Sequence, residues 1–148
     1  MSQRVREDGV MPTWTCPDCA RVFGRTRQGH ECAPAMSLED YFSTGPERER
    51  PIFDAVMEHL DTVGPVHVEP VSVGIFLKRG RSFAQLRPMP HWVALSFSVS
   101  RPVSHRLIVR KPLPHAGRFH HVVRLQGPAD VDDEIRNWLT EAYEACRL

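Results

Sequence analysis

The sequence predicts an α+β fold, in which two amphipathic helices cover one face of an antiparallel sheet of four to five strands, preceded by a small Cys/His unit. In residues 47–63 and 131–146, apolar residues recur every three or four positions, which is the period of a helix with one buried side. Between these segments, apolar and polar residues alternate, as in strands with one buried face. The order helix, strands, helix therefore indicates one layer of helices on one sheet.

Composition divides the 148 residues into four parts. Residues 1–13 are polar and without periodicity, and are predicted to be a disordered leader. Residues 14–32 hold the Cys/His unit, and residues 33–46 are interpreted as a connector. Residues 47–148 form the α+β domain, which is long enough for a hydrophobic core of its own.

The first expected helix, residues 47–63, ends at Gly64 and Pro65, a pair that stops a helix. Its apolar stripe consists of Ile52, Phe53, Val56, Met57, Leu60 and Val63. A single helical turn is expected in the connector at residues 37–42, with Ser37 as N-cap. The apolar side of this turn, Leu38, Tyr41 and Phe42, is spaced to dock on the main domain.

The strands are expected between residues 66 and 126, where the apolar period becomes two. Gly80 favours a hairpin, because glycine tolerates the positive φ of a tight turn. The expected strands are residues 71–78 (Val71, Val73, Ile75 and Leu77 on one face), 82–87, 91–99 (Val93, Leu95, Phe97 and Val99 inward), a weaker one in 105–110, and 119–126. Prolines at positions 102, 112 and 114 keep the intervening loops out of a central ladder.

The chain ends with the second amphipathic helix, for which Asp130 is the expected N-cap. The acidic residues that follow it suit the positive end of the helix dipole. The buried stripe is predicted to be Val131, Ile135, Trp138, Leu139, Ala142 and Cys146. Cys146 is interpreted as a small buried apolar residue.

Residues 14–32 carry the strongest chemical motif, four zinc-type ligands: Cys16, Cys19, His30 and Cys32. Two residues between the first two cysteines is the spacing of a metal knuckle, and four protein ligands leave no open position for catalysis. We therefore expect a structural Zn²⁺, with Trp14 and Phe23 as the apolar lid of a unit too small to fold without metal. A reduced, metal-free loop is the alternative.

Charge is segregated along the chain. Residues 64–127 hold ten Lys and Arg against the single acid Glu69, whereas the chain as a whole has a net charge of +1. Such a basic segment attracts polyanions, unless acidic helices neutralise it in surface ion pairs. The candidate polyanion-binding residues on the open sheet face are Arg87, Trp92, Arg106, Arg110, Arg118 and Arg124. Arginines there would contact phosphates, and Trp92 would stack on a base.

No nucleophile elbow, phosphate loop, zincin motif or dinucleotide fingerprint occurs. His120 and His121 are neighbours on a strand, so they point to opposite faces and do not form a catalytic pair. His67 and Glu69 share a face, which predicts a local hydrogen bond. These observations favour a non-enzymatic binding or regulatory module, with nucleic acid or another polyanion as the expected partner. The alternatives are a protein–protein adaptor with purely structural zinc and an enzyme acting on a small anionic ligand.

The chain has no apolar run of membrane-spanning length. Its first residues are polar and charged, so no signal peptide is expected. A cytoplasmic protein without a membrane partner is therefore expected. The sequence identifies no ligand, pathway or oligomeric state.

Several segments together resemble a known family. They are residues 14–32, 37–42, 51–54, 64–70 and 128–139. Residues 14–32 are similar to the short zinc module that opens many bacterial proteins of the uncharacterised domain of unknown function 5655 family, and the other segments are similar to its main domain. More distantly, the order of elements resembles YdhG-like α+β domains. The resemblance implies a fold and a modular architecture, but no reaction and no catalytic residues.

Overall fold

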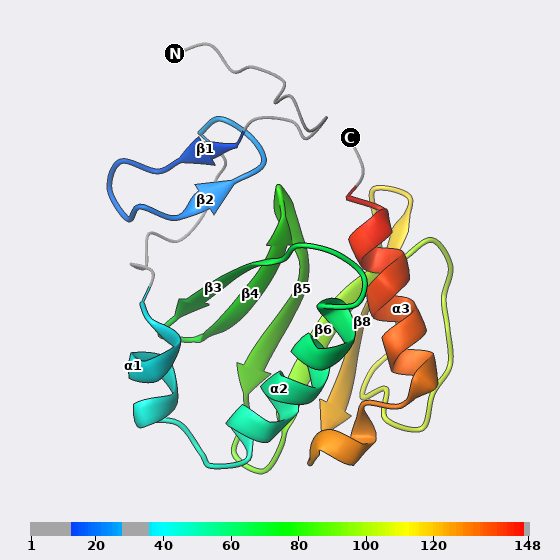
Figure 1. The fold of residues 1–148 in the computed structure, drawn as a ribbon. Coiled ribbons are helices and arrows are strands. Elements are labelled where there is room, and N and C mark those ends of the chain that lie inside the picture. The colour runs from blue at the N-terminus through cyan, green and yellow to red at the C-terminus, as the bar shows by residue number, and fades with distance from the viewer. Residues whose placement is uncertain (1–12, 28–35, 147–148) are drawn as a thin grey trace.

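The computed structural model describes residues 13–27 and 36–146 (Figure 1). The predicted α+β class is confirmed, with an antiparallel six-stranded sheet of order β3-β4-β5-β6-β8-β7. A separate two-stranded hairpin, β1-β2, precedes it. The elements are β1 (Trp14–Thr15), β2 (Val22–Phe23), α1 (Leu38–Ser43), α2 (Glu49–Leu60), β3 (His67–Val71), β4 (Gly74–Arg79), β5 (Arg81–Pro88), β6 (Val93–Val99), β7 (Leu113–His115), β8 (Arg118–Leu125), the 3-10 helix η1 (Pro128–Asp130) and α3 (Asp133–Glu144).

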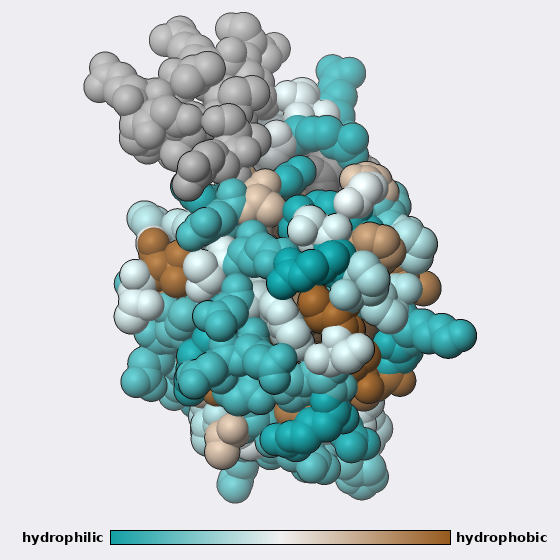
Figure 2. Space-filling model, turned by 90° about the vertical axis from the view of Figure 1, so that its right-hand side faces the viewer, coloured by the Kyte–Doolittle hydropathy of each residue, from teal (hydrophilic) through white to brown (hydrophobic). Residues whose placement is uncertain are grey.

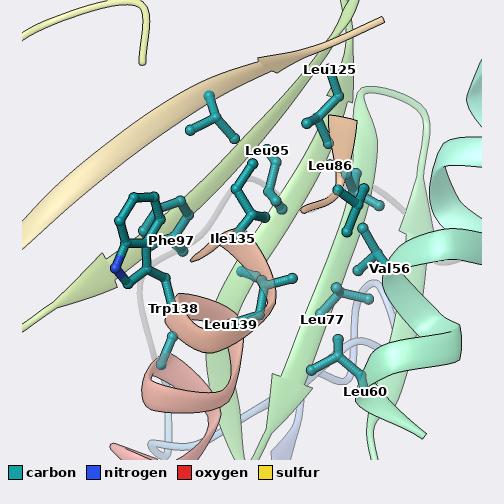
Figure 3. Close-up of a cluster of buried hydrophobic side chains, with 14 of the residues drawn as sticks. Val56, Leu60, Leu77, Leu86, Leu95, Phe97, Leu125, Ile135, Trp138 and Leu139 are labelled. Carbon is teal, nitrogen blue, oxygen red and sulfur yellow. The ribbon is translucent and has the colours of Figure 1, made fainter. Parts of the chain in front are cut away.

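Helices α2 and α3 lie side by side over one face of the six-stranded sheet (Figure 1). Figure 3 shows Val56 and Leu60 of α2, and Ile135, Trp138 and Leu139 of α3, pointing at the sheet. The sheet side chains that meet them include Leu77, Leu86, Leu95, Phe97 and Leu125, each at most 2% exposed. Leucine-sized side chains buried this fully contribute roughly 1.5–3 kcal/mol each. The helix-covered face, called the inner face below, therefore holds the core.

The helix ends follow the expected chemistry, with one correction. Ser37 caps α1, because its Oγ accepts a hydrogen bond from the Asp40 amide at 3.1 Å. The expected N-cap of the last helix, Asp130, is wrong: residues 128–130 form η1, and Asp132 caps α3 by accepting from the Ile135 amide at 3.0 Å. Pro128 explains the difference, since proline suits the first turn of a helical segment, which moves the start of α3 towards the C-terminus.

The strand count of four to five is too low. The expected strand 71–78 starts at the last residue of β3 and otherwise corresponds to β4, because Ser72 and Val73 form the turn between them. The rest of β3 was not expected as a strand. Val73 is 44% exposed rather than inward. Gly74 explains the position of the turn: a Cβ there would lie 2.5 Å from the carbonyl oxygen of Leu86, so only glycine lets β4 approach β5 this closely.

The edge beyond β8 also differs from the expectation. The expected weak strand at 105–110 is reduced to an isolated bridge between Ile108 and Val123, and the edge strand of the described sheet is β7 instead. The predicted hairpin at Gly80 is confirmed, with φ of 75° at that residue.

Among the described residues, no helix is long and apolar enough to span a bilayer.

Candidate functional site

The cysteine turn lies between the strands of the small hairpin. Cys16 and Cys19 are 3% and 5% exposed, on either side of a turn closed by the hydrogen bond from the Ala20 amide to the Cys16 carbonyl, 2.9 Å. Ala20 has φ of 62°, in the left-handed region that favours glycine. Two buried sulfurs at one tight turn match half of a structural zinc site.

The other two predicted ligands, His30 and Cys32, lie outside the described residues. Within residues 13–27 and 36–146, no three His, Cys, Asp or Glu side chains gather as a metal site. Phe23 is 4% exposed and packs on Trp14, with ring centroids 6.1 Å apart. This is the apolar lid that the sequence predicts for the unit.

The hairpin β1-β2 is attached to the sheet by a buried charge cluster around Glu69 of β3. This carboxylate accepts from Arg21 Nε at 2.7 Å and from the Val22 amide at 3.1 Å, both in the hairpin. It also accepts from Lys78 Nζ at 2.8 Å. Lys78 bonds to the Val22 carbonyl as well, so one sheet carboxylate and one sheet ammonium hold both sides of the same hairpin residue.

The contacts in this cluster shift the pKa values of Glu69 and Lys78. Burial alone would raise the pKa of Glu69, but hydrogen bonds from Lys78, Arg21 and the Val22 amide outweigh it and lower the pKa to about 2. Burial lowers the pKa of Lys78, and Glu69 opposes this effect. The predicted contact between His67 Nε2 and Glu69 is confirmed at 3.1 Å. Glu69, the single acid of the basic segment, is therefore fully engaged in this cluster.

Two of the candidate arginines lie on the sheet face away from the helices, called the outer face below. In the sheet register Arg87 of β5 and Arg124 of β8 both pair with Ala94 of β6, from opposite sides. Their neighbours Leu86 and Leu125 belong to the core, so the two arginines point outward. Strands lie about 4.8 Å apart, which places the two backbones roughly 10 Å from one another. Neither arginine has a carboxylate partner in the part of the chain that the structure describes.

The remaining candidates are dispersed. Trp92 is half-buried in the β5–β6 turn, at the Arg87 end of the sheet. Arg106 lies 3.9 Å from Asp130 and is partly neutralised. Arg118 donates to the Ser98 carbonyl at 2.8 Å, at the opposite end of β8 from Arg124. Arg110 is exposed and close enough to His120 to lower its pKa, although burial is the larger cause. The six predicted residues therefore do not form one patch.

A hollow of about 1010 Å³ lies where β5 begins, β6 ends and α3 ends. Its basic lining residues are Arg25, Arg81, His115, Arg118 and His120, and the described lining contains no Asp or Glu. In Figure 1 these segments meet near the tip of the β4–β5 hairpin and the β7–β8 turn. Figure 2, which faces the right-hand side of that view, shows a mainly hydrophilic surface with hydrophobic side chains in small groups.

His105 and His121 have structural roles. His105 Nδ1 accepts from the Leu107 amide at 3.0 Å, so its Nε2 carries the proton that is donated to Asp132 at 2.8 Å. Both ring nitrogens of His105 are thus occupied. His121 is fully buried on the inner face and accepts from the Val103 amide at 3.0 Å, whereas His120 points outward, as the strand period predicts.

Sequence reasoning missed two features. Arg21 and Lys78 were not connected to Glu69, although a lone acid among ten bases is a signal for a buried ion pair. The hollow was missed because its lining comes from five separate segments. The signal for one of them is the basic hairpin around Gly80.

The fold and the site together define a class: an α+β domain that carries a docked cysteine hairpin on its sheet. Residues 38–145 match the family model described as Domain of unknown function (DUF5655), and the chain belongs to that family. The match starts at the first residue of α1, so it does not include the cysteine hairpin. No curated protein and no solved structure gives a significant match. The likeness of residues 14–32 to a zinc module, and the relation to YdhG-like domains, stay predictions.

Proposed function

We propose that this protein is a non-enzymatic binding module with a structural zinc, and that its outer sheet face binds single-stranded nucleic acid. One observation carries the proposal: Arg87 and Arg124 flank Ala94 on the outer face and have no carboxylate partner among the described residues. A surface of this kind offers two guanidinium groups to consecutive phosphates. Phosphate contacts supply most of the affinity for nucleic acids.

The electrostatics of the sheet support this choice. Glu69 is the only carboxylate between residues 64 and 127, and it is 2% exposed and bonded to Arg21 and Lys78. It therefore does not compete for Arg87 or Arg124. Glu141 of α3 pairs with Arg101 instead, and Asp130 of η1 lies 3.9 Å from Arg106.

The binding test compares two variants with equal loss of charge. Arg87→Gln/Arg124→Gln removes both outer-face guanidiniums, while Arg50→Gln/Arg136→Gln removes two from α2 and α3, outside the outer face. Binding of a fluorescent twelve-nucleotide thymidine strand is measured by anisotropy between 50 and 300 mM salt. The outer-face variant should bind at least about tenfold more weakly, and its log–log salt slope should fall by about 1.4, because each single-strand contact contributes about 0.7. The helix-face variant should bind as the wild type does.

Equal binding by the two variants, or binding that does not depend on salt, contradicts the proposal. Absence of any oligonucleotide binding at 50 mM salt by a folded, zinc-loaded protein contradicts it too, and favours the adaptor alternative. Folding of each variant is checked by circular dichroism.

The zinc part of the proposal has its own test. Cys16 and Cys19 would supply two ligands from one turn, and His30 and Cys32 the other two. The purified protein should release one zinc per chain to a chelator, with a change in Trp14 fluorescence that Trp14→Phe abolishes. Cys16→Ser should lose the metal, whereas Cys146→Ser, at a buried cysteine that follows α3, should keep it. A metal-replete sample without zinc overturns this part.

A further inference from the structure

We infer that the hollow at the C-terminal end of α3 binds a small organic phosphate with an apolar body, at a site separate from the outer-face arginines. The hollow measures about 1010 Å³, at the upper end of the range of small-molecule pockets, roughly 300–1,000 Å³. It is lined by strand ends, by the end of α3, by Gly24 and Arg25, which follow β2, and by the β7–β8 turn.

The charges of the hollow select an anion. Three arginines line the hollow, and two of them are held in place by backbone carbonyls: Arg81 Nη2 donates to Ala145 O at 2.9 Å, and Arg118 Nη2 to Ser98 O at 2.8 Å. Each guanidinium has five N–H donors, so most remain for a ligand. Arg25 is exposed and has no hydrogen-bond or acidic partner among the described residues.

A doubly charged anion suits this arrangement better than a carboxylate. A phosphate monoester carries about −1.5 to −2 charges at pH 7 and three acceptor oxygens, and arginine binds it in a bidentate manner. The C-terminal dipole of α3 opposes an anion. However, its last carbonyls are already bonded, Tyr143 O to Arg79 and Ala145 O to Arg81, which offsets much of that negative end.

The apolar part of the lining selects the rest of the ligand. Leu113, which is 49% exposed, lines the hollow together with Pro114, Phe83 and Ala142. A leucine this exposed beside a group of cations is explained by a ligand that combines an apolar body with an anionic end. A sugar phosphate lacks the first part, and a neutral aromatic compound lacks the second.

His120 provides a local reporter of the anion. Burial, and then the charges of Arg110 and His121, lower its pKa. A bound dianion favours the protonated ring and therefore raises this pKa. The shift can be followed by NMR of the His120 ring protons, separately from any change at His67 or His91, which do not line the hollow.

The test uses the full, zinc-loaded chain with phenyl phosphate, glucose 6-phosphate, inorganic phosphate and benzyl alcohol as probes. Phenyl phosphate should bind at least tenfold more tightly than each of the others and raise the pKa of His120. Arg25→Gln/Arg118→Gln should weaken it about tenfold or more. The matched control Arg27→Gln/Arg101→Gln, two arginines outside the lining, should not. Leu113→Ser should weaken phenyl phosphate and leave inorganic phosphate unchanged, which keeps the test valid if the double variant folds poorly.

Equal affinity for all four probes, equal binding by the two double variants, or an unchanged His120 on saturation overturns the inference. Tighter binding of glucose 6-phosphate than of phenyl phosphate overturns the assignment of an apolar body. The inference does not rest on the nucleic-acid proposal: Arg87→Gln/Arg124→Gln should bind phenyl phosphate as the wild type does, so the two fail separately.

Discussion

Replacing Glu69 with glutamine removes one negative charge from the cluster that holds the cysteine hairpin to β3, with little change of shape. The pKa of Glu69 is about 2, against an ordinary value of 4.5, which corresponds to about 3 kcal/mol of stabilisation by the charged form. The cost of breaking a buried ion pair gives a similar figure, about 3–5 kcal/mol, because Arg21 and Lys78 would remain buried without their anion. We therefore expect Glu69→Gln to cost about 3 kcal/mol.

The loss should be local to the docked hairpin, so amide hydrogen exchange is the direct assay. The Val22 amide donates to Glu69, and a loss of about 3 kcal/mol corresponds to exchange roughly a hundredfold faster. Urea unfolding gives the global value. Glu58→Gln, the same change at an exposed position of α2, should alter stability by no more than about 0.5 kcal/mol.

The pH dependence has a defined sign. Because the folded pKa of Glu69 is lowered, its contribution is complete above pH 4.5 and is lost as the pH falls from 4.5 towards 2. The difference in the free energy of unfolding between wild type and Glu69→Gln should therefore have its whole value at pH 7 and decrease as the pH falls below 4.5. A Val22 amide that exchanges at the wild-type rate in the variant, or a variant no less stable than Glu58→Gln, would refute the reasoning.

Three further outcomes are expected. Burial raises the pKa of Glu49, which accepts a hydrogen bond from Tyr41 Oη. The stabilisation by its protonated form is complete below pH 4.5 and is lost as the pH rises through the raised pKa. In urea unfolding between pH 4 and 8, the free energy of unfolding of Glu49→Gln should therefore increase relative to that of the wild type. Ala116 and Gly117 have φ of 52° and 78°, as in a type I′ hairpin, so Ala116→Asn should stabilise by about 0.5–1 kcal/mol in thermal unfolding; a loss would contradict this. Trp138 is 7% exposed in the core, so Trp138→Ala should lower the free energy of unfolding by about 3–5 kcal/mol. A decrease below about 1 kcal/mol would show that the site of Trp138 is not well packed.

The helices were predictable because each has one apolar stripe and local end signals. Ile52 and Ile135 follow the helical period closely and are fully buried. The strands were harder, because burial on β3 does not follow the alternation: Glu69, Pro70 and Val71 are buried in succession, one of them by the hairpin of another segment. The apparent alternation from Val71 to Leu77 also continued through a turn.

In the candidate site too, local features could be predicted from the sequence, whereas contacts between distant segments could not. The turn of Cys16 and Cys19 is local, so the spacing of the two cysteines alone indicated a tight knuckle there. The pairing of Arg87 with Arg124 follows from the register of three strands, which the sequence does not encode in any single segment. Arg21 and Glu69 are 48 positions apart, and their contact depends on where the hairpin docks.

Because the hairpin docks on the sheet, the segment that matches the family model is shorter than the segment that packs together as one structure. The family pattern starts at residue 38, yet the anion in its first strand is neutralised by Arg21, which lies upstream of that limit. In a fragment that starts at residue 38, Glu69 would keep only Lys78 and the exposed His67 ring within salt-bridge distance. The ring of Phe76, on which Arg21 stacks at 4.8 Å, would become exposed. We therefore expect a fragment of residues 38–145 to be less stable than a chain that keeps the hairpin.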